Sequence, residues 1–387
     1  MDRSNPQRDL PMESCDALIV GGGPAGSSCA WQLRRHGMDV VVMDKADFPR
    51  DKVCAGWITP AVIDALQLDT EDYARQHVLQ PITAFLTGLI DGDEVETRYP
   101  APVSFGIRRY ELDNYLLQRA GARLRPGQLL ESLQRDGDQW IVNNAISTRL
   151  VIGAGGHFCP VARFMGAKLG ATEPAIAAKE IEFEMTPAQR NECKVRGDTP
   201  ELYFCADLKG YGWCFRKRDY LNIGLGREDN HLLSDQLKDF CNFLKRRGRI
   251  PRDIPESFHG HAYLLYGHSV RKQLDDGMLL VGDAAGLAYP QSGEGIRPAV
   301  ESGLMAASTI IEACGDYRRQ QLRPYAERLV ERFGPAETIA KAEPSSLRKF
   351  LAGILLGNRW FTRHVVLDRW FLHVHQAALE STGTLGM

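Results

Sequence analysis

Two glycine-rich turns, one near each end of the chain, constrain this fold more than any other feature of the sequence. The first spells Ala-Leu-Ile-Val-Gly-Gly-Gly-Pro-Ala-Gly from Ala17 to Gly26. The second spells Met-Leu-Leu-Val-Gly-Asp-Ala-Ala-Gly from Met278 to Gly286. In each case the apolar run predicts a buried parallel strand, and the glycines mark the place where the chain turns sharply.

The first turn fits a dinucleotide-binding βαβ unit. Gly21 would allow the tight turn, Gly23 the close approach of backbone to a pyrophosphate, and Gly26 the packing of helix on strand. A second apolar run, 40–43, ends in Asp44, which is placed to accept hydrogen bonds from ribose hydroxyls. A lone glycine fingerprint is a weak indicator, but the second turn carries an aspartate as well. Together they suit a chain that wraps both halves of an extended dinucleotide, and we predict FAD.

Composition excludes several other classes of protein. The chain has 387 residues, 44% of them hydrophobic and 25% charged, which predicts two or three globular domains. A net charge of −2 gives no indication of a nucleic-acid partner. The nine cysteines are scattered without metal-ligand spacing, so we expect neither a metal site nor a disulfide framework. Their odd number and the lack of a signal-peptide pattern favour a cytoplasmic location.

The motif positions predict an α/β (α+β) chain in which segments of different domains alternate. We assign a Rossmann-like FAD-binding domain to residues 14–66, 103–165 and 270–320, an antiparallel-sheet substrate domain to 67–102 and 166–269, and a C-terminal helical region to 321–387. Within the substrate domain, 67–102 is expected to form strands and turns, with a hairpin tip at 90–93. The later segment is expected to hold strands over 180–266 and one helix near 232–247.

Further motifs resemble those of a known family along nearly the whole chain. They are Lys-Val-Cys-Ala-Gly at 52–56, Arg-Tyr-Glu-Leu-Asp at 109–113, Tyr-Gly-Trp-Cys-Phe at 211–215, Asn-Ile-Gly-Leu-Gly at 222–226 and Pro-Gln-Ser-Gly-Glu-Gly-Ile at 290–296. The chain resembles flavoproteins of the aromatic-hydroxylase fold, and within them most closely the geranylgeranyl reductase group. It departs from the family pattern at Gly155, where an aspartate is usual, at Arg216, where a proline is usual, and at Trp57, which interrupts a glycine run.

The resemblance and the glycine turns together nominate the residues of the site. Those expected to bind the cofactor are Gly21, Gly23, Pro24, Ala25, Gly26, Asp44, Lys45, Arg50, Lys52, Cys54, Ala55, Gly56, Arg109, Gly282, Asp283, Ala284, Gly293, Gly295 and Ile296. The loop at 290–295 would lead into a helix whose N–H groups stabilise negative charge on the reduced flavin. Asp283 is expected to accept a hydrogen bond from a ribityl hydroxyl.

Cys54, Tyr211 and Trp213 are the residues expected to act in the reaction. A thiol beside a reduced flavin can protonate a carbon next to the one that receives hydride; the alternative is a small buried apolar residue. Tyr211 and Trp213 alternate on a strand and so share a face, either lining the pocket or packing in the core. His259 and His261 also share a face, but nothing completes a metal site, and we expect surface histidines.

The implied reaction is reduction of carbon–carbon double bonds in a lipophilic substrate, isoprenoid or polyketide-like. NAD(P)H or a ferredoxin would donate the electrons. The alternative reaction is that of an FAD-dependent monooxygenase on an aromatic or lipid-like substrate. A halogenase fits less well, because Tyr211, Phe215 and Arg216 replace residues of its motif and the chain is short for that group. Proteins of the Rab escort class share the fold and only bind prenylated partners, but intact phosphate loops argue against that role.

The C-terminal residues 347–379 mix apolar and aromatic residues with arginines. The apolar runs are much shorter than the roughly 20 residues that span a bilayer. Helices packed over the substrate domain are one interpretation, and peripheral membrane contact through interfacial helices is the other.

Overall fold

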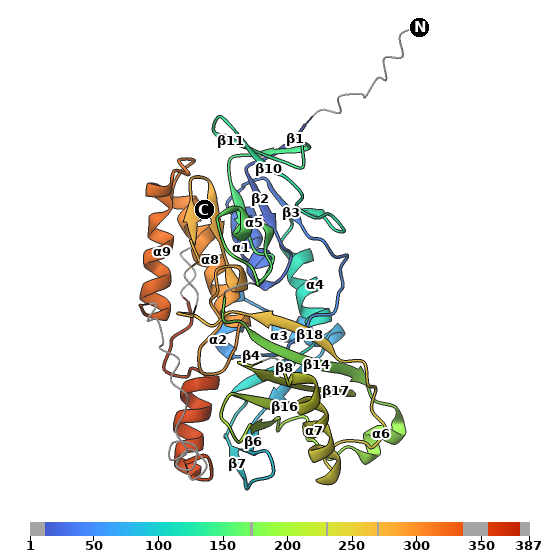
Figure 1. Ribbon diagram of the computed structural model, residues 1–387. Helices are drawn as coiled ribbons and strands as arrows, with labels where there is room; N and C mark the ends of the chain where they lie inside the picture. Colours follow the sequence, from blue (N-terminus) through green and yellow to red (C-terminus); the bar gives the residue numbers. More distant parts are fainter. Residues whose placement is uncertain (1–11, 171–172, 230, 269–270, 336–354, 380–387) are drawn as a thin grey trace.

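The computed structural model describes residues 12–170, 173–229, 231–268, 271–335 and 355–379, and confirms the mixed α/β fold. A parallel sheet with its helices lies at one end of the molecule and a large antiparallel sheet at the other (Figure 1). The C-terminal helical segment lies beside the antiparallel sheet, near β6 (Ala84–Leu89) and β7 (Glu94–Arg98).

The six-stranded sheet has the order β19-β20-β13-β2-β3-β9. All neighbours pair in parallel except β19 and β20. Its strands are β2 (Ala17–Val20), β3 (Val40–Met43), β9 (Arg123–Arg125), β13 (Val151–Gly153), β19 (Leu274–Asp275) and β20 (Met278–Leu280). The strand order reverses between β2 and β13, and a doubly wound sheet binds its ligand at such a point.

Two long helices cover the same side of this sheet, in close contact with each other. They are α1 (Pro24–Arg35) and α8 (Ile296–Glu312). A Cβ on Gly303 would lie 2.3 Å from the carbonyl oxygen of Ala25, so only glycine lets the helices approach this closely. α9 (Arg319–Phe333) packs on α8 and buries Leu322, Tyr325 and Leu329.

The seven-stranded sheet has the order β18-β14-β17-β16-β15-β6-β7. All neighbours are antiparallel except β15 and β6. The strands not yet bounded are β14 (Ile176–Glu184), β15 (Glu201–Phe204), β16 (Gly210–Lys217), β17 (Tyr220–Arg227) and β18 (His259–Tyr263). One face packs against α7 (Leu233–Arg246) through Leu237, Phe240 and Leu244, while Trp213 and Phe215 belong to the core on the opposite face.

Smaller elements complete the fold around these two bodies. A four-stranded sheet consists of β1 (Glu13–Cys15), β10 (Leu133–Asp136), β11 (Gln139–Val142) and β12 (Ile146–Thr148), and a three-stranded sheet consists of β4 (Trp57–Ile58), β5 (Leu79–Ile82) and β8 (Ser104–Ile107). The shorter helices are α2 (Pro60–Leu66), α3 (Thr70–Gln76), α4 (Arg109–Arg119), α5 (Pro160–Phe164) and α6 (Pro187–Glu192). The 3-10 turn η1 spans Gly282–Ala284. At the C-terminal end, α11 (Arg359–Phe361) continues into the π-helical η2 (Thr362–Phe371).

The predicted elements agree with the structure in most places. The hairpin tip at 90–93 joins β6 to β7, and the helix predicted near 232–247 is α7. The expectation of strands alone was wrong for α3 and α6, which begin at caps: Asp69 accepts from two backbone N–H groups, and Thr186 forms a capping box. The domain boundaries stay a prediction.

The three-stranded sheet bears on those boundaries, since β5 and β8 come from segments assigned to different domains. Of the C-terminal helical region, residues 336–354 and 380–387 lie outside the described residues. Among the described helices, none combines the length and the apolar character that a membrane crossing requires.

Candidate active site

A cavity of about 700 Å³ lies where the parallel sheet, α8 and the antiparallel sheet meet. Nearly all the predicted site residues line it: Gly21, Gly23, Pro24, Ala25, Asp44, Lys45, Arg50, Lys52, Cys54, Ala55, Gly56, Arg109, Tyr211, Trp213, Asp283, Gly293, Gly295 and Ile296. Residues from both ends of the chain therefore face one space, as the two glycine turns predicted.

Gly26, Gly282 and Ala284 do not line the cavity. A Cβ on Gly26 would lie 1.9 Å from the carbonyl oxygen of Gly21, so this glycine permits helix–strand packing. The N–H of Gly282, which has a φ of +59°, donates to Ser302 Oγ at 2.9 Å, and the carbonyl oxygen of Ala284 accepts from Arg271 at 2.9 Å. These residues shape the turns behind the wall of the cavity.

One end of the cavity has the backbone geometry and charge that suit a diphosphate. Gly21, with a φ of +118°, directly follows β2, and a Cβ there would lie 2.3 Å from the carbonyl oxygen of Ala154. Pro24 then starts α1 with Gly23 as its N-cap, and a Cβ on Gly23 would meet only Arg50, at 3.5 Å. Free N–H groups and the positive end of the helix dipole therefore face the cavity beside a guanidinium.

Asp44 lies at the end of β3, next to this turn. Its Oδ2 accepts from Gly22 N at 2.7 Å, and its Oδ1 accepts from Ala46 N at 2.9 Å. These two backbone donors hold the carboxylate in a fixed orientation at the edge of the cavity. The position fits the predicted ribose contact.

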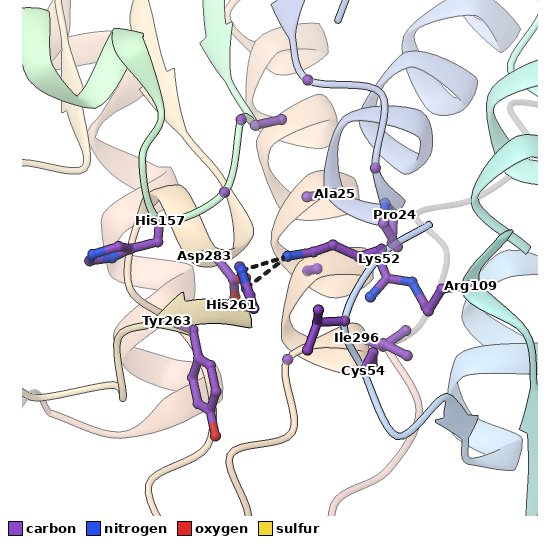
Figure 2. Close-up of a pocket in the computed structure, with 18 of the residues that line it drawn as sticks. Pro24, Ala25, Lys52, Cys54, Arg109, His157, His261, Tyr263, Asp283 and Ile296 are labelled. Atoms are coloured by element: carbon purple, nitrogen blue, oxygen red, sulfur yellow. Dashed lines mark hydrogen bonds and ion pairs between the residues drawn. The ribbon is translucent and has the colours of Figure 1, made fainter. Parts of the chain in front are cut away.

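Lys52, His261 and Asp283 form a cluster inside the cavity. Lys52 Nζ lies 2.7 Å from His261 Nε2, and that nitrogen lies 3.5 Å from Asp283 Oδ2. Figure 2 shows Lys52 reaching across the cavity to His261, with Asp283 next to the ring. The prediction of a surface histidine was wrong for His261, because this residue in the middle of β18 turns its ring into the cavity; His259, at the start of the strand, is exposed.

Burial and mutual charge shift the pKa values of this cluster. Burial lowers the pKa of Lys52 to about 8, although Asp283 opposes the shift. Burial also lowers the pKa of His261. For Asp283, burial acts to raise the pKa, but the hydrogen bond with His261 and the charge of Lys52 outweigh it, and the pKa falls below its usual range. A carboxylate is thus kept ionised beside an amine that loses its proton more readily than usual.

The opposite side of the cavity holds the start of α8. Gly295 is its N-cap and Ile296 its first residue, so the N-terminal N–H groups of a 17-residue helix face the cavity. Tyr211 donates from its hydroxyl to the carbonyl oxygen of Ser292 at 2.5 Å. This bond ties the antiparallel sheet to the loop that leads into α8.

Cys54 lies in a partly buried loop between these elements. The N–H of Gly56 donates to its Sγ at 3.4 Å. Three residues after Cys54, Trp57 is buried in β4, with its ring stacked on Phe215 at a centroid distance of 5.1 Å. The tryptophan that interrupts the family's glycine run therefore anchors the Cys54 loop in the core beneath the antiparallel sheet.

The other departure with a structural reason is Gly155. A Cβ there would lie 3.3 Å from both the Cα and the Sγ of Cys159, so the aspartate common in the family would fit only if Cys159 moved by a few tenths of an ångström. Sequence reasoning also missed Glu294 as a cavity residue. Burial raises the pKa of Glu294 to about 7, although the charge of Arg297 opposes the shift. The sequence signal that could have identified this residue was its position in the Gly-Glu-Gly turn before α8.

The residues of the cavity fit FAD. The two glycine turns open a path along the backbone, the starts of α1 and α8 present N–H groups, and Asp44 and Asp283 offer carboxylates at separate places in the cavity. The fold and site define an FAD-dependent oxidoreductase. The chain belongs to the family described as FAD binding domain, which it matches over residues 14–329.

Individual relatives narrow the class further. The chain is 27% identical over 332 residues to a digeranylgeranylglycerophospholipid reductase of Methanocaldococcus jannaschii, covering 82% of each chain. It is 29% identical over 353 residues to a menaquinone reductase of Mycobacterium tuberculosis, covering 85% of this chain and 83% of the relative. The resemblance to the geranylgeranyl reductase group is thus confirmed.

Solved structures share the fold. A geranylgeranyl bacteriochlorophyll reductase-like protein from Thermoplasma acidophilum superimposes with a TM-score of 0.71 at 22% identity, covering 89% of this chain and 88% of its own. A probable FAD-dependent monooxygenase from Pseudomonas aeruginosa gives a TM-score of 0.64 at 18% identity, covering 92% of this chain and 100% of its own. The fold alone therefore serves both reductases and oxygenases.

Proposed function

We propose that this protein reduces carbon–carbon double bonds of a lipophilic substrate, isoprenoid or polyketide-like. The observation that carries the proposal is a second cavity of about 420 Å³ next to the first. Tyr211, Tyr263, Ser292 and Gly293 line both cavities. The second cavity is bordered largely by apolar side chains: Ile176, Phe204, Leu208, Leu265, Leu355, Leu356, Phe361 and Trp370. Such a wall suits a long hydrocarbon chain whose reacting end lies in the first cavity.

The residues of this chain have distinct parts in the reaction. FAD, when bound and reduced, supplies the hydride. Cys54 holds a thiol proton at the edge of the cavity and delivers it to the carbon next to the one that receives hydride. Tyr211 and Trp213 form the apolar wall that holds the double bond and excludes water. The names of the relatives, which are lipid and quinone reductases, support a lipophilic substrate.

Anaerobic reduction followed by mixing tests this proposal. The purified protein is reduced without oxygen and mixed with a geranylgeranyl lipid, with its fully saturated counterpart, or with oxygen. Return of the oxidised absorbance with the unsaturated lipid alone supports the reductase. Reoxidation by oxygen only, with an oxygenated product from a supplied aromatic substrate, would instead establish the monooxygenase that the Pseudomonas fold neighbour suggests.

The remaining expectations concern partners and place. We propose NAD(P)H or a ferredoxin as electron donor, and a cytoplasmic enzyme, consistent with nine cysteines that are all unpaired. Peripheral membrane contact is supported by the C-terminal segment, where Trp360 is 66% exposed among Arg359, Arg363 and Arg369. A Trp360→Ala variant should lose binding to anionic lipid vesicles in co-sedimentation; unchanged binding would argue against this contact.

A further inference from the structure

The indole of Trp213 lies over a glycine slot in the neighbouring strand. Trp213 on β16 pairs with Gly224 on β17. A Cβ on Gly224 would lie 2.2 Å from the indole Cζ2 and 2.9 Å from the Cβ of Glu180, and one on Gly226 would lie 3.7 Å from the indole Cζ3. The two glycines of the Asn-Ile-Gly-Leu-Gly motif thus leave a flat surface for the indole. Asn222, the polar residue of this motif, lies at the end of the slot.

The amide of Asn222 joins three separate parts of the structure. Its Oδ1 accepts from the indole Nε1 of Trp213 at 2.7 Å, and its Nδ2 donates to the carbonyl oxygen of Cys54 at 3.2 Å and to Glu180 Oε2 at 3.1 Å. An indole N–H can only donate, so the oxygen of the amide must face Trp213 and the nitrogen must face the two acceptors. Asn222 is 1% exposed, and both N–H groups and the oxygen have partners.

We propose that Asn222 is the positioning residue that sets the Cys54 loop against the Trp213 wall. The proposal rests on the proposed function in assigning a reaction role to Cys54. Trp213 and Cys54 both line the cavity, and a single buried side chain bonds to both residues. If the loop moved, these donors and acceptors would be left in the interior without hydrogen-bond partners. The network therefore favours one arrangement of the Cys54 loop.

Glu180 completes the network from β14. Burial raises its pKa to about 8, while the charge of Lys217 opposes the shift and that of Glu182 adds to it. At neutral pH the carboxyl is therefore mostly uncharged, and it serves Asn222 as a hydrogen-bond acceptor. A Glu180→Gln variant retains a carbonyl acceptor, so it should preserve the position of the Cys54 loop.

The test compares Asn222→Leu and Asn222→Asp with Thr87→Val, a matched change at another buried polar residue of the same sheet, outside the cavity. The first measurement is the rate at which iodoacetamide alkylates Cys54 in the FAD-bound protein, read by mass spectrometry of the Cys54 peptide. We expect this rate to rise about tenfold in both Asn222 variants, since losing buried partners frees the loop, and to stay unchanged in Thr87→Val and Glu180→Gln. Equal rates in all variants would overturn the proposal.

The second measurement is a double-mutant cycle on turnover. Asn222→Leu should lower kcat about tenfold with little change in KM, but it should cost almost nothing in a Cys54→Ala background. An equal loss in both backgrounds would show that Asn222 does not act through Cys54. Trp213→Phe, which removes the indole N–H donor together with part of the ring, should also speed Cys54 alkylation and covers the case in which the Asn222 variants fail to fold. If the protein reduces no double bond at all, the alkylation rates still decide the positioning role.

Discussion

The side chains of Lys52 and His261, 209 positions apart in sequence, meet inside the candidate active-site cavity with Lys52 Nζ 2.7 Å from His261 Nε2. This contact joins the loop of Cys54 to the last strand of the antiparallel sheet, and Asp283 from the second glycine turn lies 3.5 Å from the same histidine nitrogen. The cluster thus links three segments that the sequence presents as separate motifs.

FAD affinity should depend on pH through Lys52. Its pKa in the folded protein is about 8, lowered mainly by burial, so the side chain is charged below pH 8 and neutral above it. A cationic Lys52 favours an anionic diphosphate cofactor, and Kd should therefore rise by up to about tenfold per pH unit above pH 8. Titration of the apoprotein by flavin fluorescence between pH 6 and 10 measures this. The Lys52→Met variant should bind FAD more weakly at pH 7, and its Kd should no longer rise above pH 8. If its Kd still rose above pH 8, another titrating group would be responsible for the pH dependence.

Asp283→Ala should weaken FAD binding on the order of 100-fold, because the partly buried carboxylate that we propose as acceptor for the ribityl chain is lost. The ratio of flavin to protein in the purified variant, read from absorbance, reports the effect. Asp235→Ala on the exposed side of α7 is the matched control and should stay fully yellow. Full flavin occupancy in Asp283→Ala would refute the assignment.

Cys54→Ala should slow turnover by about 10²-fold while leaving FAD bound, as expected for loss of a positioned proton donor. Steady-state kinetics on the lipid substrate and the flavin absorbance of the same sample give the two numbers. The comparison variant is Cys314→Ala, which changes an exposed thiol that does not line the cavity. If both variants turn over equally, Cys54 is a structural residue.

Comparing Gly21→Ala with Gly37→Ala separates two contributions to the unfolding free energy, the strain of a positive φ and the clash of a Cβ with neighbouring backbone. Both glycines have positive φ, +118° and +79°, but only at Gly21 does a Cβ meet backbone, 2.3 Å from Ala154 O. Gly37→Ala should cost about 1 kcal/mol of unfolding free energy. Gly21→Ala should cost more than about 3 kcal/mol, because a clash adds to the strain. Urea unfolding followed by circular dichroism measures both, and equal costs would contradict the argument.

The two glycine turns show how far sequence reasoning reaches in this fold. Gly21, Gly23 and Gly26 are tied to local geometry, since a strand that turns into a helix at a diphosphate leaves no room for side chains. The hairpin at 90–93 was also predictable from local sequence, because its tip contains residues that favour a tight turn. The helices α3 and α6 were missed because they are short and begin at polar caps rather than at an apolar period.

His261 and Asn222 illustrate what local pattern could not supply. Nothing in the alternation of β18 distinguishes a histidine that faces solvent from one that faces Lys52, because the difference lies in which distant loop covers the strand. Similarly, the motif at 222–226 was visible, but the bonds of Asn222 to Trp213 and Cys54 depend on the pairing of β16 with β17 and on the packing of Trp57.

The sequence by itself determined the cofactor and the family and nominated 18 of the residues that line the cavity, because dinucleotide binding imposes short-range rules on backbone turns and helix starts. Only the tertiary structure decided which side chains work together. The Lys52–His261–Asp283 cluster, the Asn222 network and the second apolar cavity each join segments that are remote in the chain. The pKa values and hydrogen-bond partners of the two polar clusters depend on their burial together. This burial arises because the two sheets and α8 enclose one space.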